Sequence, residues 1–155
     1  MSLTLRNHSP ADFEALYEID QSCYPRGIAY SRRTLRWFLG LKNADCVVAE
    51  TEERGEQRIA GFIITESAKA SGHIITLDVA ESFRRAGAGT ALLSDAERRM
   101  GRRGVEFVIL ETAVTNEAAV AFWKRSGYQI IGKIPRYYLG RVDAFEMAKR
   151  IVTSS

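Results

Sequence analysis

Residues 73–90 read HIITLDVAESFRRAGAGT, and this stretch combines a strand, a basic glycine loop and the start of a helix. The strand is predicted by apolar, mostly β-branched side chains at Ile74, Ile75, Leu77 and Val79. A helix is predicted from Thr90, because apolar residues then recur on one face at Leu92, Leu93, Ala96 and Met100. The loop between strand and helix carries two arginines and two glycines, namely Arg84, Arg85, Gly87 and Gly89.

This loop has the composition of an anion-binding site. The first amides of a helix have no partner inside the helix, and the helix dipole favours negative charge in front of them. Gly87 and Gly89 have no side chain, so a phosphate can approach the backbone closely. No Lys-Ser/Thr pair follows the second glycine, and Leu92 stands where a dinucleotide fingerprint has its third glycine. The loop therefore fits neither of these two nucleotide-binding patterns, but it could bind another phosphate-bearing ligand. The alternative is a glycine turn that only leads into a helix.

The composition is that of an ordinary globular protein, with 46% hydrophobic and 26% charged residues in 155. This length predicts a single domain over residues 1–155. The net charge of +3 mildly favours an anionic ligand and does not indicate a nucleic-acid partner. A solvated helix face is the expected setting of the clustered arginines Arg98, Arg99, Arg102 and Arg103.

Targeting and metal-binding signals are lacking. No apolar run is long enough to span a membrane, and the first ten residues, MSLTLRNHSP, have no signal-peptide core. We therefore expect a cytoplasmic protein with no membrane partner. Cys23 and Cys46 have no metal-ligand spacing and indicate no disulfide framework, so no metal site is predicted.

Capping and turn residues predict the remaining elements. Ser9 and Ser31 each begin a helix, the first of which ends before Pro25, and a later helix runs from Asn116 or Thr115 to Ser126. Strands are predicted at residues 3–6, 45–51, 58–66, 105–111, 128–134 and 143–149. The order β-α-α-β-β-β-α-β-α-β-β indicates an α/β fold, with a mixed central sheet of about seven strands and helices on both faces. In this arrangement Glu111 ends a strand that is covered on both faces.

Three motifs, in this order, resemble those of the GNAT acetyltransferases. Arg84-x-x-Gly87-x-Gly89 resembles the R/Q-x-x-G-x-G/A loop of that family. Residues 116–128, NEAAVAFWKRSGY, resemble its N-x-x-A-x-x-x-Y-x-x-x-G-F segment. Residues 137–144, YYLGRVDA, resemble the Y-Y-x-G-x-x-D-A ending of the RimI-like protein N-terminal acetyltransferases. The likeness to the RimI-like enzymes runs from about Leu77 to Met147 and is looser over the first 70 residues.

The resemblance implies a GNAT fold and an enzyme that transfers acetyl from acetyl-CoA to a primary amine. The acceptor it implies is a protein or peptide N-terminal α-amine, which attacks directly in a ternary complex. Two alternatives stay open, a small-molecule amine acetyltransferase and a non-catalytic acyl-CoA-binding module. A monomer or a homodimer is expected.

The same resemblance assigns roles to individual residues. The coenzyme would be held by Leu77, Asp78, Val79, Arg84, Arg85, Ala86, Gly87, Ala88, Gly89, Thr90, Asn116 and Trp123. Trp123 departs from the family, which usually has a tyrosine there that is proposed to protonate the leaving thiolate; its alternative role is core packing. Substrate-lining residues would be Tyr30, Tyr137 and Tyr138, the last of which could also serve as the missing acid.

Glu111 stands where the RimI-like enzymes place the general base. A carboxylate beside an apolar strand loses hydration, which favours its protonated form and suits a base that works near neutral pH. His73 is the second catalytic candidate, because the resemblance places it where some N-terminal acetyltransferases of higher organisms carry a tyrosine implicated in proton removal, and histidine titrates in a useful range. The alternatives are an exposed carboxylate at a strand end and a structural histidine.

Overall fold

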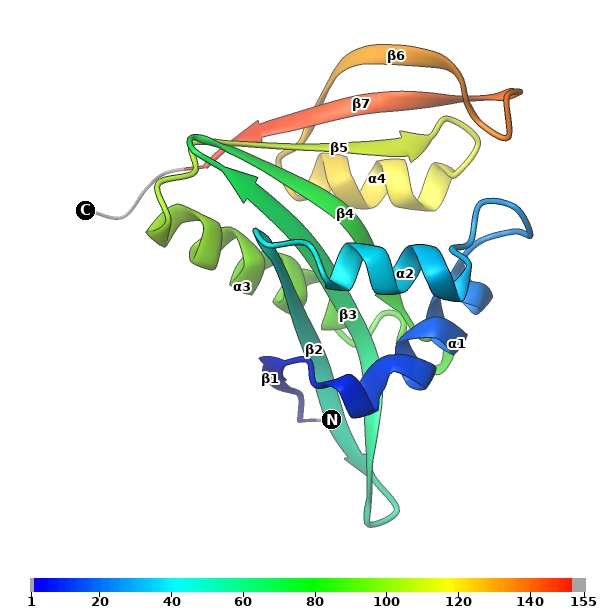
Figure 1. The fold of residues 1–155 in the computed structure, drawn as a ribbon, viewed down its shortest axis with the longest axis vertical. Coiled ribbons are helices and arrows are strands. Elements are labelled where there is room, and N and C mark those ends of the chain that lie inside the picture. Colours follow the sequence, from blue (N-terminus) through cyan, green and yellow to red (C-terminus); the bar gives the residue numbers. More distant parts are fainter. Residues whose placement is uncertain (1, 152–155) are drawn as a thin grey trace. The chain divides into compact units, whose positions relative to one another are not determined.

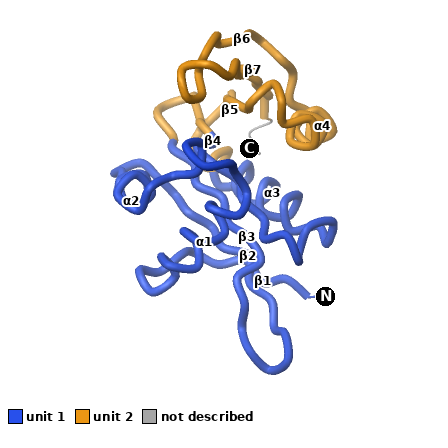
Figure 2. The backbone as a smooth tube through the Cα atoms, turned by 90° about the vertical axis from the view of Figure 1, so that its right-hand side faces the viewer, with its two compact units in different colours: residues 1–66, 74–99 blue, residues 67–73, 100–155 orange. Residues whose placement is uncertain are grey.

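The computed structural model describes residues 2–151, which form seven strands, four α-helices and two short 3-10 helices, η1 (Pro10–Asp12) and η2 (Glu81–Phe83). Figure 1 traces them along the chain. The predicted order of strands and α-helices is confirmed. The chain divides into two compact units, residues 1–66 with 74–99 and residues 67–73 with 100–155, which Figure 2 colours separately. No helix among the described residues is long and apolar enough to cross a membrane.

The strands of the first unit are built on a long hairpin. β2 (Ala44–Glu53) and β3 (Glu56–Ala68) pair antiparallel, and β1 (Thr4–Asn7) adds to the other edge of β2. The predicted hairpin is confirmed, but both strands are longer than expected. The turn between them is only Arg54-Gly55, and both residues have positive φ, at 53° and 81°. A two-residue turn of this kind matches the twist of the strands, so the ladder continues to the turn.

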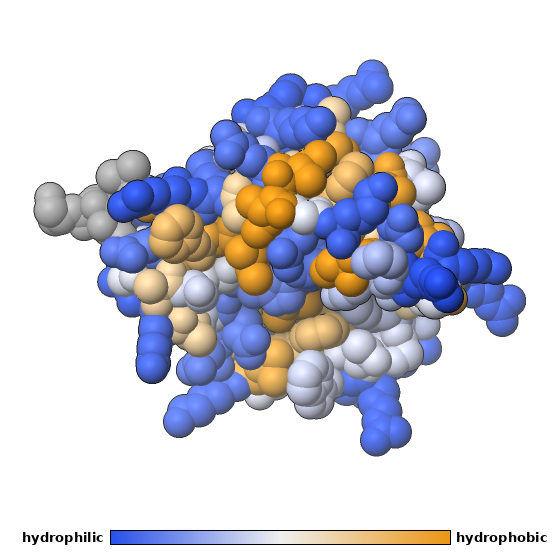
Figure 3. All heavy atoms as spheres, turned by 90° about the horizontal axis from the view of Figure 1, so that it is seen from above, coloured by the Kyte–Doolittle hydropathy of each residue, from blue (hydrophilic) through white to orange (hydrophobic). Residues whose placement is uncertain are grey.

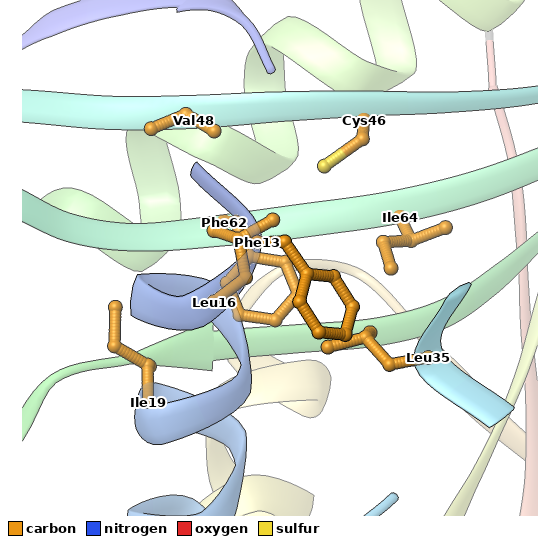
Figure 4. Packing of buried hydrophobic residues seen from close by; sticks show 8 residues of the cluster. All are labelled: Phe13, Leu16, Ile19, Leu35, Cys46, Val48, Phe62 and Ile64. Atoms are coloured by element: carbon orange, nitrogen blue, oxygen red, sulfur yellow. The ribbon is translucent and has the colours of Figure 1, made fainter. Parts of the chain in front are cut away.

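Helices cover both faces of this unit's strands. α1 (Phe13–Cys23) and α2 (Arg32–Leu39) lie on one face, and α3 (Ala88–Arg102) lies on the other in both views (Figures 1 and 2). The core on the α1 side, drawn in Figure 4, joins two helices and two strands. It consists of Phe13, Leu16, Ile19, Leu35, Cys46, Val48, Phe62 and Ile64. Burial of this apolar surface is what fixes the helices on the sheet.

The predicted helix boundaries in the first unit hold where a capping residue marks them. The Ser31 hydroxyl accepts from the backbone N–H of Thr34 at 3.1 Å, which begins α2. The Ser9 N–H donates to the Asp12 carboxylate at 2.7 Å and begins η1, which leads into α1. The expected start of α3 at Thr90 was wrong, because the helix already begins at Ala88. Its apolar residues Leu92, Leu93, Ala96 and Met100 are all buried, as predicted.

The second unit contains β5 (Phe107–Ala113), α4 (Glu117–Arg125), β6 (Gln129–Tyr138) and β7 (Val142–Arg150). β7 pairs antiparallel with both β5 and β6. β4 (Ser71–Val79) begins in this unit, where Ser71–His73 pair in parallel with Phe107–Ile109. The predicted parallel strand–helix–strand unit is therefore confirmed. A side chain at Gly72 would place its Cβ 2.5 Å from Met100 Sδ, so only glycine allows this close approach.

Two predictions on the second unit were wrong. β5 does not end at Glu111 but continues to Ala113, and its side chains alternate between a buried and a more open face. Only one face is therefore fully covered, and Glu111 lies on the other. β6 runs through Pro135 to Tyr138, residues that were expected to separate two strands. Proline is tolerated there because β6 is an edge strand.

All seven strands belong to one mixed sheet in the order β1-β2-β3-β4-β5-β7-β6, which confirms the predicted fold class. The edge strand β6 carries exposed apolar side chains at Ile130 and Ile131. Figure 3 views the molecule from the β6 side, where apolar side chains gather among charged ones.

Candidate active site

His73 and Glu111 come together in the second unit. His73 pairs with Ile109 in the parallel ladder, and Glu111 lies two residues further on the same face of β5. The His73 Nε2 atom lies 2.7 Å from Glu111 Oε1. Because a carboxylate can only accept, Nε2 carries the proton and donates it to this bond. The side chains are 36% and 14% exposed, so the pair can be reached from solvent but is not fully hydrated.

Two tyrosines at the end of β6 are linked to the same carboxylate. The Tyr137 phenol donates a hydrogen bond to Glu111; burial, the negative charge of Glu111 and this bond raise the pKa of Tyr137. The pKa of Tyr138 is also raised, first by burial and then by the charges of Tyr137 and Glu111. The two rings pack edge to face, with centroids 4.8 Å apart. Both phenols therefore stay protonated at neutral pH and act as donors.

The basic loop in the first unit has the backbone shape that an anion site needs. Gly87 has φ +84° and its carbonyl accepts the first helical bond of α3, from Ala91 at 3.0 Å. Arg85 also has positive φ, 66°, which is unusual for a residue with a side chain. The first amides of α3 follow directly after these residues, and amides at a helix start favour an anion. The predicted loop Arg84–Thr90 thus begins directly after η2, continues through a turn at residues 84–87 and ends with the first three residues of α3.

The three strand residues that precede this loop differ in which side they present. Leu77 and Val79 lie on the more open face of β4, whereas the Asp78 side chain is fully buried. Any contact of Asp78 with the coenzyme would therefore use its backbone. The Val79 carbonyl already accepts from Arg84 Nε at 3.2 Å and from Cys23 Sγ at 3.4 Å.

The two predicted coenzyme residues on α4 are occupied by structural contacts. The Asn116 side-chain oxygen caps α4 by accepting from the Ala119 N–H at 3.2 Å, and its amide nitrogen is not used in this bond. Trp123 is buried and packs edge-on against Phe122 and Tyr128, at centroid distances of 5.1 and 5.4 Å. These contacts describe the packing alternative for Trp123; its contact with a coenzyme stays a prediction.

Tyr30, predicted to line the substrate site, belongs to the first unit. Its hydroxyl donates to the Ile75 carbonyl at 3.3 Å, and its ring packs against Phe38. It is half-buried. Both cysteines are free, and no cluster of three or more metal-ligating side chains occurs in residues 2–151.

Comparison with known proteins identifies the class. Residues 13–128 match the acetyltransferase (GNAT) family. The chain is 30% identical over 149 residues to an uncharacterized N-acetyltransferase of Methanocaldococcus jannaschii. This match covers 96% of this chain and 92% of that protein. It is also 38% identical over 74 residues to N-alpha-acetyltransferase 30 of Schizosaccharomyces pombe. This match covers about half of each protein, 48% of this chain and 49% of the relative.

A solved structure gives the same result for the fold. The ribosomal-protein-S18-alanine N-acetyltransferase from Escherichia coli superposes with a TM-score of 0.84 at 25% identity, over 99% of this chain and 97% of that one. The protein therefore belongs to the GNAT family and is an N-acetyltransferase with the GNAT fold. The resemblance first indicated by the three sequence motifs is confirmed.

Sequence reasoning missed two features of the site. The bond between Tyr137 and Glu111 was not predicted, because residues 135–138 were not expected to continue a strand beside β7. Asp20 was overlooked, although its spacing from Phe13 and Leu16, at i+7 and i+4, places it on the apolar face of α1. A charged residue on a buried helix face is a signal that could have found it.

Proposed function

We propose that this N-acetyltransferase transfers acetyl from acetyl-CoA to the N-terminal α-amine of a protein or peptide. The proposal takes its acceptor class from the N-alpha-acetyltransferase of Schizosaccharomyces pombe and the ribosomal-protein-S18-alanine N-acetyltransferase. The amine attacks directly in a ternary complex, without an acetylated enzyme residue.

The observation that carries the proposal is the hydrogen bond between His73 and Glu111. An amine must lose its proton before it can attack a thioester, and most α-amines are protonated near neutral pH. Glu111 accepts that proton, directly or through a water, while His73 holds the carboxylate in place and can pass the proton to solvent. Its 14% exposure leaves Glu111 accessible to an amine while limiting competing hydration.

Acetyl-CoA supplies the acetyl group as a thioester. In the proposal, the loop Arg84–Thr90 holds its pyrophosphate through the amides at the start of α3, with Arg84 and Arg85 adding positive charge. The backbone of Leu77 and Val79 holds the pantetheine arm. Tyr138 is the donor toward the leaving sulfur, since its raised pKa keeps the phenol protonated. Tyr137 and Tyr30 line the acceptor.

The test is release of CoA from acetyl-CoA against two panels. One contains short peptides that differ in their first residues, each with a free and a blocked N-terminus; the other contains polyamines, aminoglycosides and amino acids. We expect turnover on free N-termini and none on the blocked partners. Turnover confined to small amines would overturn the acceptor class, and coenzyme binding without turnover on either panel would overturn catalysis itself.

A further inference from the structure

Two buried aspartates lie together in the first unit, and the chemistry proposed above uses neither side chain. Asp20 lies on α1 and Asp78 on β4, and both are fully buried. Their side chains interact directly with each other. Within residues 2–151 neither carboxyl has an ion pair, so no cation compensates their charge. Burying two adjacent carboxylates without a cation is very costly.

The hydrogen-bond accounting assigns a proton to this pair. Asp20 Oδ2 accepts from the Tyr30 N–H at 2.7 Å, and Asp78 Oδ1 accepts from the Thr76 hydroxyl at 2.5 Å. The other two oxygens, Asp20 Oδ1 and Asp78 Oδ2, are buried and have no donor at hydrogen-bond geometry, although the Tyr24 hydroxyl lies close to Asp78. Two carboxylate oxygens cannot bond to each other unless one carries a proton. Burial, followed by the bond to Asp20 and its charge, raises the pKa of Asp78 well above its usual value.

Besides burial and Asp20, the main influences on Asp78 come from the uncharged Thr76 and Tyr24 hydroxyls. Cys23 at the end of α1 and Tyr24 just after it lie close to Asp78, and burial together with the charge of Asp78 raises the pKa of both. Cys46 on β2 is affected in the same direction. Arg84 is a cation close to these side chains, and its guanidinium donates to the Val79 carbonyl and to Cys23 Sγ.

The pair fastens the segment 24–30, between α1 and α2, to β4. Asp20 holds the backbone of Tyr30 at the end of that segment. The Tyr24 hydroxyl, at its start, lies 3.4 Å from the Leu77 carbonyl and from the Thr76 hydroxyl. The Tyr30 hydroxyl donates to the Ile75 carbonyl. A predicted wall of the acceptor site is thus tied to a strand predicted to hold the coenzyme.

We propose that Asp20 and Asp78 share one proton and act as a positioning pair, which fixes the segment 24–30 on β4 and thereby sets the affinity for the acceptor. Their role toward the acceptor rests on the proposed function; the shared proton does not. The folded chain keeps one proton that the unfolded chain releases above about pH 4. The free energy of unfolding must therefore fall as pH rises through the range in which the pair stays protonated.

The free energy of unfolding, measured with urea between pH 5.5 and 7.5, tests for this proton, because its pH slope gives the number of protons released on unfolding. The wild type is compared with Asp20→Asn/Asp78→Asn, in which an amide hydrogen takes the place of the proton. We expect the pH slopes to differ by one proton. A difference of zero would mean two carboxylates and a difference of two would mean two acids, and either would overturn the proposal. Because the wild type and the double variant contain the same histidines, histidine titration contributes equally to both pH slopes and cancels in their difference.

Two further measurements guard this result. Asp12→Asn removes another buried aspartate, one that is paired with Arg6, and should leave the slope in this range unchanged. The infrared spectrum of the native wild type at pH 7.5 should contain the carbonyl band of a protonated carboxylic acid. Its absence would overturn the shared proton even if the double variant fails to fold.

The positioning role is tested with kinetics at pH 7. Asp20→Ala should raise the KM for the acceptor peptide about tenfold, with the coenzyme Kd unchanged within twofold, and Asp20→Asn should restore KM to within threefold of wild type. An equal rise of KM and coenzyme Kd, or no rescue by asparagine, would overturn the positioning role. If no peptide is a substrate, the proposed function fails while the proton count still stands or falls by itself.

Discussion

The strand β4 contributes to two carboxyl sites that differ in almost every respect. Asp78 is sealed, and its contacts are another carboxyl, a threonine hydroxyl and buried phenol and thiol groups. Glu111 contacts His73, which comes from the same strand, and lies partly open to solvent beside two phenols. Asp78 is closed to solvent and substrate. Glu111 is partly exposed and contacts a histidine that can take up a proton.

The comparison teaches that burial and partners, rather than residue type, decide what a carboxyl can do. A carboxyl sealed with another acid holds one proton and can only fix the backbone around it. A carboxyl that contacts a histidine at a partly open edge can exchange protons with a substrate.

The largest effect is expected for Glu111→Gln. The amide keeps the size and a hydrogen-bonding oxygen but cannot accept a proton, so kcat should fall by about a hundredfold or more, with nearly unchanged coenzyme affinity. Steady-state kinetics on a peptide substrate measure this. Glu106→Gln, at an exposed position just before β5, is the matched control and should match the wild type. Full activity of Glu111→Gln would remove Glu111 from the mechanism.

His73→Gln should have the next largest effect. Glutamine can still donate to Glu111, but it cannot take up a proton, so we expect kcat to fall about tenfold and its pH dependence to change shape. A pH–rate profile from 5.5 to 9 checks this. An unchanged profile would reduce His73 to a structural partner of Glu111.

Gly87→Ala probes the loop of the first unit. A Cβ at Gly87 would meet no atom within 4 Å, so its cost is the backbone conformation at φ +84°, about 1 kcal/mol. The loop should relax away from its anion-binding shape, and calorimetry should find the coenzyme Kd raised about five- to tenfold. Gly101→Ala, in α3 with equally open space, should leave Kd unchanged and stabilise the fold slightly. Equal Kd values for both variants would contradict an anion site at this loop.

The smallest effect concerns a carboxyl that behaves oppositely to Asp78. Arg6 donates to Asp12 at 2.8 and 3.0 Å and lowers the pKa of Asp12. Its contribution is fully present above the unfolded pKa of about 3.9 and is lost as pH falls through the folded value. Asp12→Asn should therefore cost about 1–2 kcal/mol at neutral pH and progressively less below pH 4.

Urea unfolding measures this difference. The matched control is Glu14→Gln, which breaks the exposed pair with Arg32 and should have no measurable effect at any pH. A cost of Asp12→Asn that is the same at pH 3 and pH 7 would contradict the ionic role of Asp12.

The parts of the fold that could be predicted are those with a local chemical cause. Ser31 and Asn116 cap helices because their side chains satisfy the first amides, and Gly104 and Gly127 follow helices with positive φ. The apolar face of α3 comes from side-chain periodicity. The residues that determine these features lie within a few positions of the structure they determine.

What could not be predicted depends on partners distant in the sequence. β6 continues to Tyr138 because β7 pairs with it, and the turn at Leu139 and Gly140 lies later than Pro135 suggested. The bond from Tyr137 to Glu111 follows from that pairing. Asp20 and Asp78 are 58 positions apart, and only the packing of α1 on β4 brings their oxygens together. His73 and Glu111 were chosen separately, and their contact appeared only in the structure.

The central claim is tested most directly by measuring kcat for Glu111→Gln and Asp20→Asn side by side, on one peptide with a free N-terminus at pH 7. The account predicts a loss of about a hundredfold or more for Glu111→Gln and a value within about threefold of wild type for Asp20→Asn. Equal losses in the two variants would contradict it, because they would mean that the open and the sealed carboxyl serve the reaction in the same way.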